Sequence, residues 1–178
     1  MEKLEVFDKQ GQPTGIIKSR EEIHRGGNWH RGVHVWILNS NKELLIQKRS
    51  AQKDSHPNEW DISVAGHILA GHSNIQSALK ELEEELGLTV SKENFKYLFT
   101  YKQSSVLNNN TFFNNEIDDV YLIKKDLDIS RINLQKEEVA EIKFIPWQDL
   151  EKKIKTKDPA FVPHDEEYQK LFKYLVEK

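Results

Sequence analysis

One segment in the middle of the chain carries the pattern of a complete amphipathic helix. Ser73 and Gln76 form a capping box at its start, and Gly87 terminates it. The apolar residues between these caps fall on one helical stripe, and they are Ile75, Ala78, Leu79, Leu82 and Leu86. A helix with a single apolar stripe buries that stripe against another layer of structure. We therefore expect this helix to pack on a sheet.

The segments around this helix predict strands and shorter helices. A hairpin and a short helix capped by Ser19 and Glu22 are expected within residues 1–27, and two more helices within about 146–177. Strand patterns occur at 33–46, as a hairpin, and at 61–65, 95–101, 117–123 and 141–145. The Asn-rich stretch 107–115 is expected to be an exposed loop. This order of elements favours one α/β domain, residues 1–178, with a sheet packed between helices.

The composition excludes several classes of protein. With 26 Lys and Arg against 29 Asp and Glu, the chain has no basic field that would hold a nucleic-acid polymer. The N-terminus lacks an apolar signal core and no long apolar run follows, so we expect a cytoplasmic protein that does not bind membranes. The chain contains no cysteine, which excludes disulfides, thiolate metal sites and a cysteine nucleophile.

Three carboxylates, Glu81, Glu84 and Glu85, share the arc of the helix beside the apolar stripe. Glu81 and Glu85 form a like-charge i,i+4 pair, which costs a few tenths of a kcal/mol, roughly, in an isolated helix. Glu84 lies in the last turn, where the helix dipole disfavours anions. A cation is therefore expected nearby. It is either Lys80, paired with Glu84 on a solvated face, or Mg²⁺ or Mn²⁺ bound by the carboxylates.

The region from Gly66 to Leu88, GHILAGHSNIQSALKELEEELGL, resembles the Nudix box, G-x5-E-x7-R-E-U-x-E-E-x-G-U, in which U is a bulky aliphatic residue. The matching positions are Gly66, Glu81, Leu82, Glu84, Glu85, Gly87 and Leu88. His72 stands where the family has Glu, and Lys80 where it has Arg. In the family this pair looks like a salt bridge that braces the loop and the helix. Changing both residues either replaces this bracing contact with another one or weakens metal binding.

The segment from His24 to Gly87 is similar to one Nudix branch, that of type I isopentenyl-diphosphate isomerase and its hydrolase-like relatives. The similarity lies in NWHRGVHVWI, ELLIQKRS and HPNEWDISVAGH, and again in NNEIDDVY. The isomerase's catalytic cysteine falls at Ala65, which cannot transfer a proton. The isomerase also binds a metal through three histidines and two glutamates. Here these match His24, His30, His67 and Glu116, with Asn114 in place of the other Glu, so a second metal site is possible.

The resemblance implies the Nudix fold, a mixed sheet sandwiched between helices, and metal-dependent hydrolysis of a diphosphate. The implied ligands of Mg²⁺ or Mn²⁺ are Gly66, through its carbonyl, Glu81, Glu84, Glu85 and Glu116. Glu81 or Glu116 would orient or deprotonate the attacking water. Arg49 and Lys53 resemble residues that contact the substrate diphosphate, and His67 is also expected at the substrate.

The expected substrate is a nucleoside diphosphate derivative or another small molecule with a group linked through diphosphate. The protein is expected to be a monomer or a homodimer. Two alternatives stay open. One is an isopentenyl-diphosphate isomerase-like protein, and the other is a non-catalytic nucleotide-binding Nudix domain, which the changes at His72 and Lys80 motivate. Three tryptophans either stack on substrate or are buried structural residues, namely Trp29, Trp36 and Trp60. Three histidines match no motif, namely His34, His56 and His164.

Overall fold

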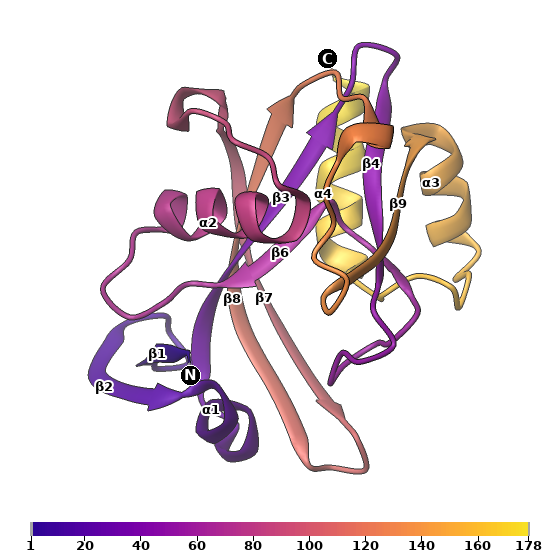
Figure 1. Cartoon of the computed structure of the whole chain (residues 1–178). Helices are drawn as coiled ribbons and strands as arrows, with labels where there is room; N and C mark the ends of the chain where they lie inside the picture. The colour runs from indigo at the N-terminus through magenta and orange to yellow at the C-terminus, as the bar shows by residue number, and fades with distance from the viewer. Residues whose placement is uncertain (1, 178) are drawn as a thin grey trace.

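The computed structural model describes residues 2–177 of the chain, in which one connected sheet lies between helices (Figure 1). The elements in chain order are β1 (Lys3–Phe7), β2 (Pro13–Ser19), α1 (Arg20–Gly26), β3 (Trp29–Leu38), β4 (Glu43–Arg49), β5 (Trp60–Asp61), β6 (Val64–His67), α2 (Asn74–Leu86), η1 (Lys92–Asn94), β7 (Lys96–Leu107), β8 (Phe112–Lys124), η2 (Ile129–Arg131), β9 (Val139–Pro146), α3 (Trp147–Lys155) and α4 (Asp165–Val176). The described part of the chain holds no helix of the length and apolarity that crossing a membrane requires.

Strand β3 is the centre of the nine-stranded sheet. It pairs parallel with β8 along its whole length and antiparallel with β6. On the other side of the molecule, β4 pairs antiparallel with β9 and with the short strand β5. Since parallel and antiparallel pairs occur in one sheet, the predicted mixed sheet is confirmed. The β3–β8 register places His30 opposite Glu116, and the β3–β6 register places His34 opposite Ala65.

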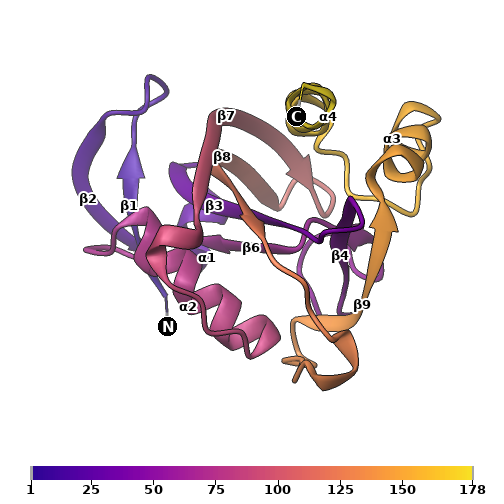
Figure 2. The same ribbon diagram turned by 90° about the horizontal axis from the view of Figure 1, so that it is seen from above.

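The two faces of β3 belong to two separate hydrophobic cores. Figure 2 shows the helices on either side of the sheet, with α2 on one side and α4 on the other. Val33, Val35 and Ile37 point to one face and pack in a core with the α2 stripe, as the sequence predicts. Trp36 points to the other face, where it packs with Tyr168 of α4. Each fully buried aliphatic side chain contributes roughly 1.5–3 kcal/mol to the stability of the folded protein. The predicted sandwich of a sheet between helices is therefore confirmed.

The helix caps predicted from the sequence are also confirmed. The Ser73 hydroxyl accepts from the backbone N–H of Gln76 at 3.3 Å, and the Gln76 side chain accepts from the Ser73 N–H at 2.8 Å. Gly87 ends α2 in the left-handed conformation with φ of 61°. Ser19 and Glu22 form the same capping box for α1. Pro146 is the N-cap of α3 and lies just before its first turn.

Two expectations about strands are corrected. The exposed loop predicted over 107–115 is confirmed only for residues 108–111, because β7 and β8 run on to Leu107 and Phe112 and pair there directly. The turn between them is short, since Asn108, Asn109 and Asn110 adopt left-handed φ values of 52°, 54° and 67°. The hairpin predicted over 33–46 pairs only at Leu38 and Leu44, because β3 turns away to pair with β6 and β8.

Candidate active site

The carboxylates of α2 line a groove of about 580 Å³ on the α2 side of the molecule. We call it the acidic groove, and its acidic lining residues are Glu2, Glu21, Asp54, Glu81, Glu84, Glu85, Glu137 and Glu138. Glu81 and Glu85 are buried, whereas Glu84 is exposed. The like-charge cluster predicted from helical spacing therefore exists in three dimensions, and other segments enlarge it.

Gly66 is the residue of β6 that makes room for Glu81. A Cβ atom at position 66 would lie 2.4 Å from both Cγ and Cδ of Glu81, far inside normal contact distance. Gly66 pairs with Val33, so its missing side chain would face α2. The matching Gly66 and Glu81 of the Nudix box are thus in direct contact, and the close approach explains the need for glycine at this position.

Burial raises the pKa values of the two inner carboxylates of α2. The pKa of Glu81 rises to about 7, although the charge of Lys80 acts in the opposite direction. The pKa of Glu85 rises to about 8, and the charge of Lys53 offsets only part of this effect. Lys80 forms an ion pair with Glu84 and lies 3.7 Å from Glu81. The Lys80–Glu84 pair expected from the sequence is present, but it leaves the buried carboxylates only partly compensated.

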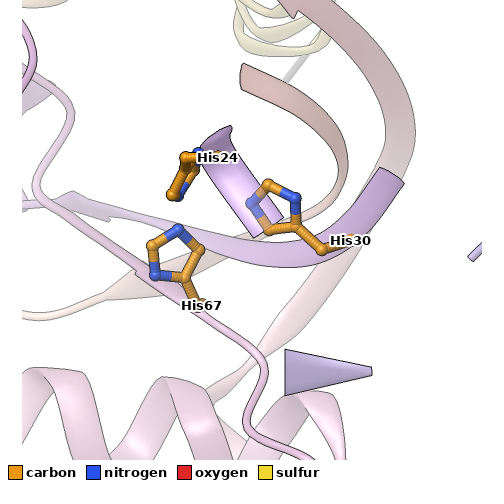
Figure 3. Close-up of side chains that lie close together, drawn as sticks. All are labelled: His24, His30 and His67. Carbon is orange, nitrogen blue, oxygen red and sulfur yellow. The ribbon is translucent and has the colours of Figure 1, made fainter. Parts of the chain in front are cut away.

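Three histidines from different elements meet on the other side of β6 (Figure 3). His24 comes from α1, His30 from β3 and His67 from β6, and one ring nitrogen of each lies within 4.8 Å of the others. Glu116 of β8 completes the group, because its Oε1 lies 3.4 Å from His30 Nε2 and 3.5 Å from His67 Nε2. The structure brings these four residues together as the resemblance implies.

The hydrogen bonds of this group suit a metal ion. Nδ1 of His24 lies 3.2 Å from the Phe113 carbonyl oxygen, and Nδ1 of His30 lies 3.1 Å from that of Asn28. A ring nitrogen that donates to a carbonyl leaves the lone pair of the other nitrogen free to bind a metal. The Nε2 atoms of His24 and His30 are buried without a hydrogen-bond partner among the described residues. Burial also lowers the pKa of His24 to about 4, which keeps its ring neutral.

Two amides hold Glu116 in place. Gln103 donates to Glu116 Oε2 at 3.1 Å, and the Asn114 amide donates to the same oxygen. Glu116 Oε1 therefore faces the histidines while Oε2 is anchored. Asn114, which stands where the isomerase has a glutamate ligand, positions Glu116 instead. Glu116 lines a cavity next to the acidic groove, whereas the three carboxylates of α2 line the groove itself.

That neighbouring cavity has a volume of about 200 Å³. We call it the histidine cavity, after its lining residues His24, His34, His56, His67 and His164. Five residues line both the cavity and the acidic groove, so the two spaces adjoin, and these are Arg20, Lys53, Ala65, Gly66 and His67. A bound molecule can therefore extend from one space into the other.

Of the two predicted diphosphate contacts, Lys53 lies at this junction and Arg49 lines the histidine cavity alone, and both have acidic partners. Arg49 lines the histidine cavity and lies 2.9 Å from Asp61. Lys53 lines both spaces and forms an ion pair with Glu138. No local sequence pattern links Asp61 to Arg49 or Glu138 to Lys53.

Three buried residues, His34, Asp61 and His164, form what we call the floor of the histidine cavity. Their ion pairs were not predicted from the sequence. His34 Nδ1 lies 2.7 Å from Glu167 Oε2, and Trp36 Nε1 donates to Glu167 Oε1 at 2.7 Å. His164 Nε2 lies 2.9 Å from Asp61 Oδ1. Trp36 is thus a buried structural residue, which settles one of the two options stated for it.

A protein-family model described as the NUDIX domain matches residues 28–165 of this chain. The chain belongs to the Nudix family. Nudix hydrolase 3 of Arabidopsis thaliana is 46% identical over 176 residues, which are 96% of this chain and 23% of that protein. This chain therefore spans less than a quarter of that relative's length. The isopentenyl-diphosphate Delta-isomerase of Pectobacterium atrosepticum is 34% identical over 83 residues, 47% of this chain and 46% of the isomerase.

Solved Nudix structures share the fold of this chain. A crystal structure from Deinococcus radiodurans matches with a TM-score of 0.68 and 20% identity, and the match covers 87% of this chain and 90% of the other. The predicted Nudix fold is confirmed. The two departures from the Nudix box also have a structural outcome: His72 is exposed, and Lys80 pairs along its own helix with Glu84. The helix and its preceding loop are thus not braced by a pair between these two residues.

Proposed function

We propose that this Nudix protein hydrolyses a diphosphate linkage in a small molecule with Mg²⁺ or Mn²⁺ as cofactor. The observation that carries the proposal is the pair of buried carboxylates, Glu81 and Glu85, which face the acidic groove beside Gly66. The Glu85 carboxylate accepts a hydrogen bond from a neutral group, the Gln47 amide, at 3.2 Å. Clustered carboxylates without full compensation suit a hard divalent cation that is shared with phosphate oxygens.

The proposed metal ligands in the acidic groove are Glu81, Glu84, Glu85 and the Gly66 carbonyl. When bound, the metal ion neutralises charge on the diphosphate and polarises phosphorus. Water attacks phosphorus, and the bond from phosphorus to the leaving phosphate oxygen breaks. The proton of the water passes to Glu81 or Glu116 as general base. The products are a monophosphate and a second phosphorylated fragment or inorganic phosphate.

Arg49 and Lys53 are proposed to bind the diphosphate. Lys53 lines both the groove and the cavity, and Arg49 lines the cavity, so a diphosphate that extends from the groove into the cavity would meet both side chains. Guanidinium and ammonium groups form strong, charge-assisted hydrogen bonds with phosphate oxygens. We propose that these bonds replace the present contacts with Asp61 and Glu138 when substrate binds.

The second proposed metal site consists of His24, His30, His67 and Glu116. The free Nε2 atoms of His24 and His30 support it, as does the anchored carboxylate of Glu116. Imidazole nitrogens suit Zn²⁺ and neighbouring transition metals, and a carboxylate also suits Mn²⁺. An ion here would lie at the edge of the substrate space, since three of these four residues line the histidine cavity.

The isomerase alternative has less support. The residue at the position of the isomerase's catalytic cysteine, Ala65, carries no group that can transfer a proton, and the chain contains no cysteine. Conversion of isopentenyl diphosphate to its allylic isomer by the purified protein would revive this alternative. The same assay separates isomerisation from hydrolysis, because only hydrolysis releases phosphate.

The test is phosphate or nucleotide release from a panel of diphosphates with Mg²⁺ or Mn²⁺, including ADP-ribose, UDP-glucose and isopentenyl diphosphate. Glu85→Gln is expected to lower kcat/KM by roughly a hundredfold or more, because changing even the residues that support a metal ligand costs about 10–100-fold. Glu83→Gln is the matched control, since Glu83 is exposed on the same helix and does not line the groove. Activity of wild type on no member of the panel, or equal loss in both variants, would refute the proposal.

A further inference from the structure

The histidine cavity has a mixed lining, with apolar side chains from Leu107, Phe112 and Val162 and polar side chains on its floor. A cavity that binds only a hydrocarbon tail is lined mainly by apolar side chains. The polar residues of the histidine cavity include His34, Arg49, Asp61, Gln103 and His164. The cavity volume of about 200 Å³ lies below the ~300–1,000 Å³ typical of pockets that enclose a drug-sized ligand. The cavity therefore fits a small fragment of a substrate and offers it hydrogen bonds.

His34 lines this cavity, and one of its two ring nitrogens has no hydrogen-bond partner among residues 2–177. Its Nδ1 bonds to Glu167 at 2.7 Å, whereas its Nε2 lies 3.8 Å from Asp118 Oδ1, too far for a hydrogen bond. Burial disfavours the charged ring, but the charges of Glu167 and Asp118 outweigh it and raise the pKa of His34 to about 10. A protonated imidazole donates from both nitrogens. The Nε2–H therefore remains available for a ligand.

Arg49 and Gln103 add a further donor and an acceptor. Arg49 donates from Nε and one terminal nitrogen to Ser55 and from the other to Asp61, which leaves two of its five N–H groups unused. Gln103 donates from its amide nitrogen to Glu116 at 3.1 Å and to Asp118 at 2.8 Å. Its carbonyl oxygen can therefore accept a hydrogen bond. The cavity thus combines donors and an acceptor within one small space.

The charges of the floor are balanced in pairs. Arg49 faces Asp61, His34 faces Glu167, and His164 lies 2.9 Å from Asp61. His34 and His164 each already have a buried carboxylate beside them, so a further anionic group of the substrate, beyond the diphosphate, would gain little attraction there. A hydroxyl group both donates and accepts a hydrogen bond and carries no charge. It is the group that complements this floor best.

We propose that the histidine cavity is a subsite for a hydroxyl-bearing group of the substrate, of about monosaccharide size, bound by His34, Arg49 and Gln103. The proposal rests on the proposed function, because it specifies the group attached to the diphosphate that the enzyme cleaves. It makes these three residues determinants of specificity. A hydrocarbon group in the same place would leave the buried donors and the acceptor without partners, which is costly.

The first test compares two matched substrates of the wild-type enzyme with Mg²⁺ or Mn²⁺, pentyl diphosphate and ribityl diphosphate. These molecules share a carbon chain and differ in their hydroxyl groups. We expect kcat/KM to be about tenfold to a hundredfold higher for the ribityl compound, because its hydroxyl groups form hydrogen bonds with charged groups of the cavity. Equal turnover of both compounds would overturn the subsite while supporting the hydrolase. Activity on neither compound and on no member of the wider panel would refute the hydrolase itself.

The second test uses variants of His34. His34→Leu removes the donor and is expected to lower the ribityl-to-pentyl ratio of kcat/KM by about tenfold or more, while His34→Gln, which keeps a donor, retains part of the preference. His72→Leu is the matched control, because His72 is exposed and lies outside the cavity. A ratio that is unchanged in His34→Leu would contradict the assignment. If that variant does not fold, the His34→Gln ratio and the wild-type comparison still decide the question.

Discussion

Replacing Gly66 with alanine tests how tightly β6 and α2 are packed at the acidic groove. The new Cβ would lie 2.4 Å from Cγ and Cδ of Glu81, whereas carbon atoms normally approach to about 3.5–4.0 Å. The Glu81 side chain or its helix must therefore move by roughly 1 Å or more. Overpacking of this kind costs about 1–3 kcal/mol of stability. A 1 Å displacement of a catalytic group can cost on the order of a hundredfold in rate.

The assay is a double-mutant cycle. We expect Gly66→Ala to lower the free energy of unfolding by about 1–3 kcal/mol in the wild-type background, measured by urea denaturation. In the Glu81→Ala background the atoms that clash are absent, so the same substitution should cost close to nothing. The kcat/KM of the single variant Gly66→Ala should fall by about a hundredfold.

Gly71→Ala is the matched control, because it adds the same side chain in the turn that joins β6 to α2, without a clash. A Cβ at Gly71 meets no atom within 4 Å, but its φ of 81° is unfavourable for alanine. We expect a stability loss of about 1–2 kcal/mol with unchanged kcat/KM. The reasoning is refuted if Gly66→Ala costs the same in both Glu81 backgrounds, or if it leaves kcat/KM at the wild-type value.

Three further outcomes are expected. Because the folded pKa of His34 is raised from 6.5 to about 10, its contribution to stability is full below pH 6.5 and is lost as the pH rises through 10. Between pH 7 and 9 the free energy of unfolding of the wild type, measured by urea denaturation, should fall by up to about 3 kcal/mol more than that of His34→Gln. An equal fall in both proteins would contradict this. Saturating Mg²⁺ or Mn²⁺ should raise the Tm of wild type by about 5–10 °C at a hundredfold excess over Kd, and Glu81→Gln should abolish this shift. Gly32→Ala should lower the free energy of unfolding by about 1–3 kcal/mol, because the added Cβ would lie 2.2 Å from Asp118 Oδ1. An unfolding midpoint equal to that of the wild type would show that this contact is absent.

Features that depend on neighbouring residues could be predicted from the sequence. The caps and the apolar stripe of α2 are local signals, so its bounds agree with the prediction. The glutamates of α2 follow from the same helical spacing. The grouping of His24, His30 and His67 could not be derived from spacing, because the three come from separate elements. It followed only from the resemblance to a known branch of the family.

Features that depend on long-range pairing were missed for a physical reason. The polar residues Asn114 and Glu116 were read as part of or next to a loop, yet they lie in β8 and face an internal cavity. Composition cannot distinguish a polar strand that lines a cavity from an exposed loop. His34 and Glu167 are 133 residues apart in the sequence, and His164 and Asp61 are 103 apart. No local pattern connects such partners, so the buried ion pairs became visible only in the fold.

The alternation of side chains along β3 has a consequence for how this protein can evolve. Val33 and Val35 hold the fold through the core under α2, while His30 and His34, on the opposite face, serve the site. If the proposed function holds, substitutions at His30 and His34 can therefore change binding without altering the core under α2, whereas Trp36 on the same face packs in the second core. Insertion or deletion of one residue has the opposite effect, because it moves every side chain beyond that point to the other face. Divergence within this strand should thus proceed by substitution alone.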